Sequence, residues 1–391
     1  MYNKSMGKRV FLFVLDGFGV GASEDANKFG DEGSNTLENV NAQIPLNIPT
    51  LKKLGLTSID GLHFPKESAI LGAYGKMREQ SIGKDTTTGH FEMMGLVTKT
   101  PRPTFPNGFP DEVVEKLEQA FGTKILGNVV ASGTQIIQDL GEEHLKTGYP
   151  IVYTSADSVL QIACHTDVVP LEKLYDYCKK AREIMNGKYE VGRVIARPFM
   201  GTINHFERIN EGRRDYSVIP GKNNTMEHLI EAKKDVIAVG KISDIFAGKS
   251  ISQNYPSHNN KDALNSTQEI LNKHFEGLCF INLVDTDMLY GHRNDVSGYA
   301  KSLEDTDQFL SKFLPEMKPD DVLMLTGDHG NDPTTPSTDH SREFTPILIY
   351  GKNVKQNVNL GILNGFYNIG QLIEEYLLGK PAEIGEKIWK E

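Results

Sequence analysis

Short apolar runs that each end at a polar residue constrain the fold of this chain most strongly. They are Val10 to Leu15, Ile151 to Tyr153, Val236 to Val239, Phe280 to Val284, Val322 to Leu325 and Ile347 to Tyr350. Continuous apolar runs of this length are typical of strands buried on both faces. Helical apolar patterns lie between them, at 111–121, 171–185, 264–275, 299–314 and 369–378. This alternation predicts an α/β sandwich with a mainly parallel sheet.

Length and local breaks predict two domains. The chain has 391 residues, which exceeds the usual length of one domain. The segments PRP and FPNGFP mark a break after residue 100, and RINEGRRDY marks another that ends at residue 216. We therefore expect a smaller α+β domain at 101–216, inserted into a core made of 1–100 and 217–391.

Charge and cysteine usage narrow the possible functions. The net charge is −10, from 42 basic and 52 acidic residues, and this disfavours nucleic acid as a partner because a phosphate backbone requires a basic face. A local basic pocket for a small phosphate ester stays compatible with this charge. Three widely spaced cysteines, Cys164, Cys178 and Cys279, without a CxxC motif, are typical of a reducing compartment. We expect them to be buried and inert.

The N-terminal segment predicts a cytoplasmic protein. Residues 1–9 are polar, and the apolar run that follows them ends at Asp16. This run is too short for a signal peptide or a transmembrane helix. No membrane and no obligate protein partner is expected.

Aspartates and histidines gather in the loops that follow the predicted strands. They are Asp16, Asp287, His292, Asp328, His329 and His340. In open α/β sheets, ligands bind beyond the carboxyl ends of the strands. Hard divalent ions favour carboxylate oxygens, and Mn, Fe, Co or Zn also accept imidazole, so six such side chains match a two-metal site. Any single histidine could equally be a surface or hydrogen-bonded core residue; the set as a whole predicts metal binding.

A threonine cluster at Gly83-Lys-Asp-Thr-Thr-Thr-Gly-His90 supplies a candidate nucleophile. A threonine hydroxyl is unreactive at neutral pH, but coordination to a cation lowers its pKa. The same residues are also compatible with a plain turn or with the N-cap of a following helix. The residue pattern does not decide which threonine reacts.

Two glycine-rich segments resemble nucleotide-binding motifs, but each lacks a feature that its motif requires. Residues 17–22 match the G-x-G-x-x-A dinucleotide fingerprint, but no helical pattern and no acidic strand end follow them. Gly83-Lys84 resembles the end of a P-loop, yet Asp85 stands where a serine or threonine would bind Mg²⁺.

The chain resembles the phosphopentomutases of the alkaline phosphatase superfamily. The matching segments run in order from residue 11 to about 348 and include FLFVLDGFGVG, GKDTTTGHFEMMGL, IVYTSADSVLQIA, VGRVIARPF, VGKISDIF, NLVDTDMLYGH and LTGDHGNDPTTPSTDHSREFTPIL. Departures are small: DGFG where many members have DSVG, and Gly327 where alanine is common. The resemblance implies an alkaline phosphatase-like αβα core with an inserted cap.

The resemblance also implies roles for individual residues. Thr86 would be the phosphorylated nucleophile. One metal would be held by Asp16, Asp328 and His329, and the other by Asp287, His292 and His340, with manganese as the family's usual ion. Substrate would contact Ser155, Asp157, Arg193, Arg213 and Lys241; Arg214, next to Arg213, is the alternative for that position.

The implied activity is the interconversion of ribose 1-phosphate and ribose 5-phosphate, and of their 2-deoxy analogues. It would proceed through phosphothreonine and a bisphosphate intermediate, with glucose 1,6-bisphosphate or ribose 1,5-bisphosphate as activator. One alternative is another phosphatase or phosphomutase of the superfamily; a sulfatase is excluded because no C-x-P-x-R segment occurs. The other alternative, from a different class, is a metal-binding protein without turnover.

Overall fold

The structure, a computed structural model, describes residues 7–155, 158–384 and 387–390. The chain divides into two compact units, residues 1–99 together with 220–391 (unit 1) and residues 100–219 (unit 2). The unit boundaries therefore differ by one and three residues from the insertion expected at 101–216.

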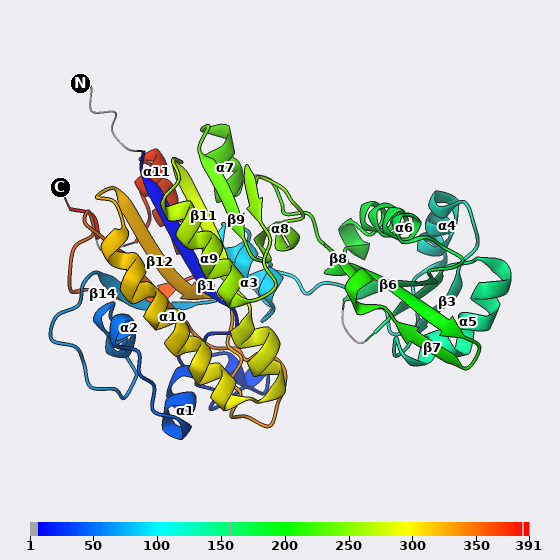
Figure 1. The fold of residues 1–391 in the computed structure, drawn as a ribbon, viewed down its shortest axis with the longest axis horizontal. Coiled ribbons are helices and arrows are strands. Elements are labelled where there is room, and N and C mark those ends of the chain that lie inside the picture. Colours follow the sequence, from blue (N-terminus) through cyan, green and yellow to red (C-terminus); the bar gives the residue numbers. More distant parts are fainter. Residues whose placement is uncertain (1–6, 156–157, 385–386, 391) are drawn as a thin grey trace. The chain divides into compact units, whose positions relative to one another are not determined.

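Unit 1 is built on an eight-stranded sheet with the order β10-β9-β11-β1-β12-β13-β2-β14 (Figure 1). The strands are β1 (Arg9–Leu15), β2 (Ala73–Arg78), β9 (Asp235–Val239), β10 (Gln253–Tyr255), β11 (Gly277–Leu283), β12 (Asp321–Gly327), β13 (Thr345–Gly351) and β14 (Val358–Asn364). Every residue of β1, β11 and β12 is buried, as their apolar runs predict. Only β13 is antiparallel to its neighbours, so the predicted mainly parallel sheet is confirmed.

Helices cover both faces of this sheet (Figure 1). They are α1 (Thr36–Gln43), α2 (Pro49–Lys53), α3 (Thr86–Met93), α7 (Thr225–Glu231), α8 (Ile242–Ile245), α9 (Asn260–Leu271), α10 (Val296–Glu316) and α11 (Asn368–Leu378). On one face, Phe11 and Phe13 of β1 pack edge-on against Phe313 of α10, with ring centroids 5.3 and 5.6 Å apart. The three candidate threonines lie at the start of α3, which packs with α8 and α11.

Unit 2 has a mixed sheet of its own with helices on both faces. The strands are β3 (Leu126–Val130), β4 (Ile151–Thr154), β5 (Val159–His165), β6 (Arg193–Thr202) and β7 (His205–Arg208) in that order, and β8 (Arg214–Ser217) pairs with β6. The helices α4 (Asp111–Phe121) and α6 (Leu171–Ile184) share one apolar core, and α5 (Gln135–Thr147) packs in another. This is the α+β architecture that the sequence predicts for the segment.

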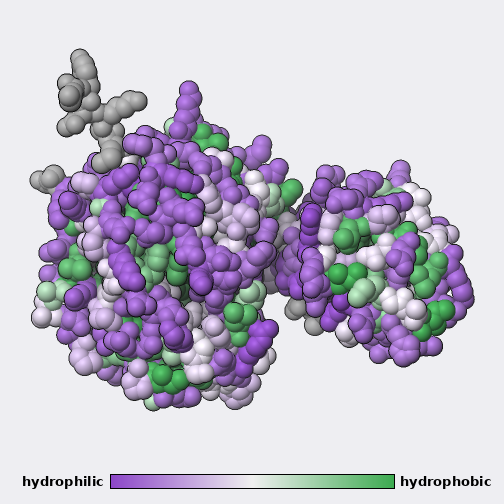
Figure 2. Space-filling view, in the orientation of Figure 1, coloured by the Kyte–Doolittle hydropathy of each residue, from purple (hydrophilic) through white to green (hydrophobic). Residues whose placement is uncertain are grey.

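The surface carries no continuous apolar belt on the face drawn in Figure 2, where hydrophilic residues cover most of each unit and apolar residues form small groups. No helix among the described residues has the length and apolar character needed to cross a membrane. All three cysteines are buried and free of disulfide bonds, and burial raises the pKa of the Cys164 and Cys279 thiols, so the expectation that they are buried is confirmed.

Candidate metal centre and nucleophile

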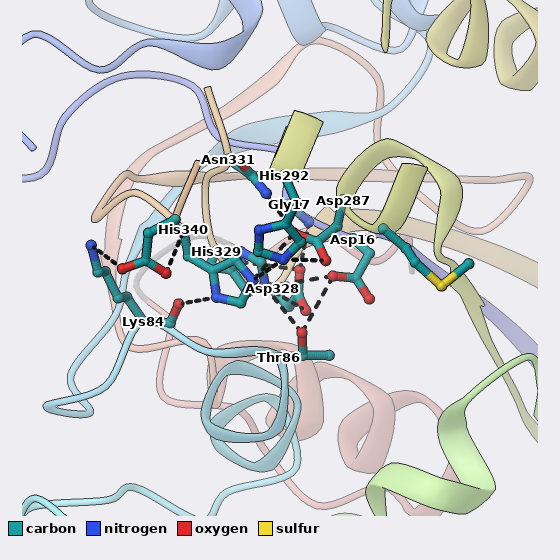
Figure 3. A network of polar contacts seen from close by, with 12 residues as sticks. Asp16, Gly17, Lys84, Thr86, Asp287, His292, Asp328, His329, Asn331 and His340 are labelled. Atoms are coloured by element: carbon teal, nitrogen blue, oxygen red, sulfur yellow. Dashed lines mark hydrogen bonds and ion pairs between the residues drawn. The ribbon is translucent and has the colours of Figure 1, made fainter. Parts of the chain in front are cut away.

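Three neighbouring strands bring two of the predicted carboxylates to one edge of the sheet. Leu283, Leu15 and Gly327 lie opposite one another on the parallel strands β11, β1 and β12. Asp16 follows β1 directly and Asp328 follows β12 directly. Because parallel strands in register end at the same level, both carboxylates enter the same space, as Figure 3 shows.

Asp16, Asp328 and His329 form a fully buried group of donors. Their ligand atoms all lie within 4.8 Å of one another, and His329 Nε2 is 3.5 Å from Asp16 Oδ1 and 3.4 Å from Asp328 Oδ2. Burial, together with the charge of Asp328, raises the pKa of Asp16. The Asp328 Oδ2 atom is buried and accepts no hydrogen bond. Burying two carboxylates near each other is costly, and a divalent cation would offset the cost.

Asp287, His292 and His340 form a second, more accessible group. Asp287 lies in a single π-helical turn (Thr286–Tyr290) that follows β11. His340 Nε2 lies 3.2 Å from Asp287 Oδ1, and His292 Nε2 lies 3.3 Å from Asp287 Oδ2. Burial opposes ionisation of Asp287, but its contacts with the two histidines outweigh burial and hold the pKa of the carboxyl below its usual range.

The three histidines of the centre present the same nitrogen to it. Each Nδ1 lies close to a backbone carbonyl oxygen. The pairs are His292 with Thr338 at 2.6 Å, His329 with Gly330 at 3.0 Å and His340 with Lys84 at 2.9 Å. A carbonyl oxygen only accepts, so Nδ1 carries a proton, and in the neutral ring Nε2 has a lone pair available to a metal ion. This arrangement is typical of metal-binding histidines.

The donor set fits divalent cations. Carboxylate oxygens and imidazole nitrogens are combined, which suits ions of the Mn, Co or Zn type. His329 lies between the two groups, since Asp287, His329 and His340 also bring their ligand atoms within 4.8 Å of one another. Two donor groups joined through a shared residue are the arrangement expected of a two-metal site.

Of the three candidate threonines, Thr86 faces the acidic centre. Asp85 is the N-cap of α3 and accepts hydrogen bonds from the backbone N–H of Thr88 at 3.1 Å and from its hydroxyl at 2.6 Å. Thr86 is the first residue of the helix, and its Oγ1 lies 3.4 Å from Asp16 Oδ1 and 3.2 Å from His329 Nε2. The N-cap interpretation of this segment is therefore correct, and it leaves one hydroxyl directed at the metal centre.

Three further polar residues support the centre, and the sequence motifs predicted no role for them. Asn282 donates a hydrogen bond to Asp16 Oδ2 at 2.9 Å, and Asn331 donates one to Asp287 Oδ1 at 2.7 Å. His90, buried on α3, is the third. The sequence offered one indication of a role for Asn282: it is an amide inside the otherwise apolar run Phe280 to Val284.

Arg342, which follows His340 by two positions, forms hydrogen bonds with the loop before Thr86. Its buried guanidinium donates to the Gly83 carbonyl oxygen at 2.6 Å and to Glu79 Oε2 at 2.5 Å. It also donates from Nε and Nη2 to the two carboxylate oxygens of Asp25, each at 3.1 Å. The loop before Thr86 is therefore held by charge-assisted bonds, which are among the stronger hydrogen bonds in proteins.

The two predicted substrate arginines of unit 2 contact one acidic side chain, Asp215. Arg193 Nη1 lies 3.3 Å and Arg213 Nη2 lies 2.8 Å from the same oxygen, Asp215 Oδ2. Ser155 follows β4 and is half-buried. Asp157 lies outside the described residues.

Unit 2 holds two more arginines near this group that the sequence analysis did not single out. Burial, and then the charges of Arg213 and Arg208, lower the pKa of Arg197. Positive charge therefore accumulates in this part of unit 2, as binding of an anionic group requires.

Lys241, the predicted substrate residue of unit 1, follows β9 and is half-buried. Its Nζ lies 3.4 Å from Met288 Sδ. Met288 follows Asp287 in the chain, so the lysine lies beside the more accessible group of the centre.

Comparison with known proteins identifies the family. A family model described as the metalloenzyme superfamily matches residues 8–381. The phosphopentomutase of Acetivibrio thermocellus is 50% identical over 372 residues, 95% of this chain and 96% of the relative. The phosphopentomutase of Carboxydothermus hydrogenoformans is 50% identical over 386 residues, 98% and 99% of the two chains, and that of Caldanaerobacter subterraneus subsp. tengcongensis 50% over 388 residues, 99% and 98%.

These matches extend over both units and confirm the resemblance drawn from the sequence motifs. The chain is therefore an enzyme that belongs to the phosphopentomutase family of the metalloenzyme superfamily.

Proposed function

We propose that this enzyme interconverts ribose 1-phosphate and ribose 5-phosphate, and their 2-deoxy analogues, through a phosphothreonine at Thr86. One observation carries the proposal: the hydroxyl of Thr86 lies 3.4 Å from Asp16 and 3.2 Å from His329, among donors suited to divalent cations. A serine or threonine nucleophile next to two cations is a recurring arrangement for phosphoryl transfer.

The metal-binding residues follow from the two donor groups. Asp16, Asp328 and His329 would hold one ion, and Asp287, His292 and His340 the other, with Mn²⁺ as the proposed metal. When bound, the ions lower the pKa of the Thr86 hydroxyl and offset the charge that develops on the transferred phosphoryl group.

Thr86 carries the phosphoryl group between two half-reactions. In the first, the bond from phosphorus to Thr86 Oγ1 breaks, a bond to a free hydroxyl of the pentose phosphate forms, and the proton of that hydroxyl ends on Thr86. In the second, the other phosphate of ribose 1,5-bisphosphate returns to Thr86, and the released sugar oxygen takes up the proton. Thr86 is the first residue of α3, and a helix N-terminus favours a phosphate because its N–H groups are unpaired.

The predicted substrate residues would orient the sugar phosphate. Ser155, Asp157, Arg193, Arg213 and Lys241 are the proposed contacts. Guanidinium groups bind phosphate through paired hydrogen bonds. We propose that unit 2 acts as a cap that excludes water, because phosphothreonine beside two cations would otherwise hydrolyse.

A phosphorylation experiment tests the proposal. Protein incubated with glucose 1,6-bisphosphate should gain one phosphate, located on Thr86 by peptide mass spectrometry, and should lose it on addition of ribose 5-phosphate. Thr86→Val removes the hydroxyl and should abolish labelling and activity. Thr87→Val, a matched change at the next position, should retain both.

Other outcomes favour the alternatives. A phosphate on another residue contradicts the assignment of Thr86. Steady release of inorganic phosphate without sugar isomerisation favours a phosphatase of the superfamily. Bound metal with neither labelling nor turnover favours a metal-binding protein without catalysis.

A further inference from the structure

His90 is a buried histidine between the nucleophile and the metal centre, and the mechanism above gives it no role. It lies one turn after Thr86 on α3 and has no exposed surface. Residues four positions apart lie on the same face of a helix. The imidazole therefore projects on the Thr86 side of α3.

One nitrogen of His90 contacts both the nucleophile residue and a predicted ligand. Nδ1 lies 2.8 Å from the carbonyl oxygen of Thr86 and 3.3 Å from Asp328 Oδ2. Because a carbonyl oxygen only accepts, Nδ1 carries the proton and donates it. Asp328 Oδ1 is already bonded to the backbone N–H groups of Gly17 and His329 at 3.0 and 3.1 Å, so His90 faces the oxygen that no hydrogen bond holds.

The other nitrogen faces the support of Asp16. His90 Nε2 lies 3.5 Å from the side-chain amide nitrogen of Asn282, and that amide donates to Asp16 Oδ2 at 2.9 Å. With the proton on Nδ1, Nε2 has a lone pair for the second hydrogen of the amide. One ring thus contacts the backbone of Thr86 and the Asp328 carboxylate, and it reaches Asp16 through Asn282.

The surroundings leave this ring little freedom to move. It stacks on Phe280 with ring centroids 5.7 Å apart. Directly before it, a side chain at Gly89 would put a Cβ 2.1 Å from the carbonyl oxygen of Asp328, so α3 packs directly against the backbone that follows β12. Hydrogen bonds of a buried polar group make the packing between two such elements more rigid.

We propose that His90 is a positioning residue that holds Thr86 in register with Asp16 and Asp328. This inference rests on the proposed function of Thr86. The Nδ1–H group performs the positioning, by bonding the first turn of α3 while it faces the unbonded oxygen of Asp328. Replacing a residue that holds a metal ligand in place typically lowers metal affinity or activity by about 10- to 100-fold.

Three substitutions separate this role from simple packing. His90→Asn places an amide N–H near the position of Nδ1, whereas His90→Gln places it near Nε2, and His90→Phe keeps the ring on Phe280 without either nitrogen. We expect H90Q and H90F to lower kcat by about 10- to 100-fold with KM little changed, and to retain less Mn²⁺ after gel filtration. H90N should stay within about threefold of the wild type in both measurements.

The control is a second buried histidine with a similar bond. In unit 2, His144 has no exposed surface and lies, through Nδ1, 2.7 Å from the Tyr149 carbonyl oxygen. H144F should lower the melting temperature and leave the Mn²⁺ content of the protein unchanged. The metal-free forms of H90N and H90Q should melt at similar temperatures, because each replaces the ring at position 90 by one buried amide.

Two results would overturn the inference. One is wild-type kcat and metal retention in H90F. The other is an equal loss in H90N and H90Q accompanied by equal destabilisation, which would mean that His90 only fills space. If the wild-type enzyme retains Mn²⁺ but never phosphorylates Thr86, the proposed function fails instead, and the metal retention of the variants still decides the role of His90.

Discussion

His292 Nε2 and His340 Nε2 lie 3.2 Å apart, and the Nδ1 atom of each ring faces a backbone carbonyl oxygen. With the proton of each neutral ring on Nδ1, two lone pairs converge on one point beside Asp287. Such lone pairs repel each other unless a cation lies between them. We therefore propose that the pair supplies two ligands of one ion.

Replacing one of these rings should remove one metal ion. We expect His340→Ala to reduce bound Mn²⁺ from two ions per chain to one, measured by plasma mass spectrometry. Activity should fall by more than about 100-fold, since even outer partners of a metal typically cost 10- to 100-fold. His63→Ala is the matched control, because this histidine is 88% exposed. Two ions retained by H340A would contradict the assignment.

Arg193 tests the proposed contact with the sugar phosphate. Arg193→Met should raise KM for ribose 5-phosphate by about 10- to 100-fold, the effect of one lost hydrogen bond to a charged group, and leave the metal content unchanged. Lys188→Met provides the comparison, because Lys188 is another cation of unit 2 and is 73% exposed. Equal KM values for R193M and the wild type would exclude Arg193 from binding.

Arg342 should contribute mainly to stability. Arg342→Met leaves Glu79 and Asp25 without their shared partner, and breaking a buried ion pair typically costs about 3–5 kcal/mol. Urea denaturation of the metal-free protein measures the change. The double variant R342M/E79M should recover part of the loss, because it also removes a buried acid. Lys146→Met, which breaks an exposed pair with Glu142, should leave the free energy of unfolding nearly unchanged.

The lowered pKa of Glu374 predicts that the protein loses stability in acid. Burial opposes its ionisation, but hydrogen bonds from Lys380, His228 and Thr225 outweigh burial and lower the pKa of the carboxyl from 4.5. A folded-state pKa below the unfolded one stabilises the protein above that unfolded pKa, and this contribution is lost as the pH falls through the folded one.

The free energy of unfolding of the wild type should therefore exceed that of Glu374→Gln near neutral pH. The difference should shrink as the pH falls below about 4.5. Urea denaturation of both proteins across this range measures it, with Glu142→Gln as an exposed control. A difference that stays constant with pH would show that Glu374 acts through packing alone.

Much of the fold could be predicted because strand periodicity is local. The run Val10 to Leu15 became β1 with one residue added, and the helical pattern at 299–314 became α10 (Val296–Glu316). The direction of β13 could not be predicted, since an apolar run looks the same whichever way it enters a sheet. The short helices α7 and α8 were not predicted, because segments of seven and four residues are too short to show helical periodicity.

The convergence of the acidic residues could also be predicted, because carboxyl ends of parallel strands share an edge. The choice among the three threonines could not, since it depends on Asp85 capping α3 through Thr88. Asn282 was hidden for a similar reason: its partner, Asp16, lies 266 positions away.

The order of apolar and polar residues by itself determined the central strands, several of the helices between them and the chemical type of the site, because these depend on neighbours along the chain and on the donor atoms of each side chain. Only the tertiary structure decided which hydroxyl faces the acids, which nitrogen each histidine presents and where His90 lies. Contacts between distant segments settle most of these questions, such as those of Thr86 with Asp16 and His329 and that of His340 with the Lys84 carbonyl oxygen, and they exist only once the sheet has brought the segments together.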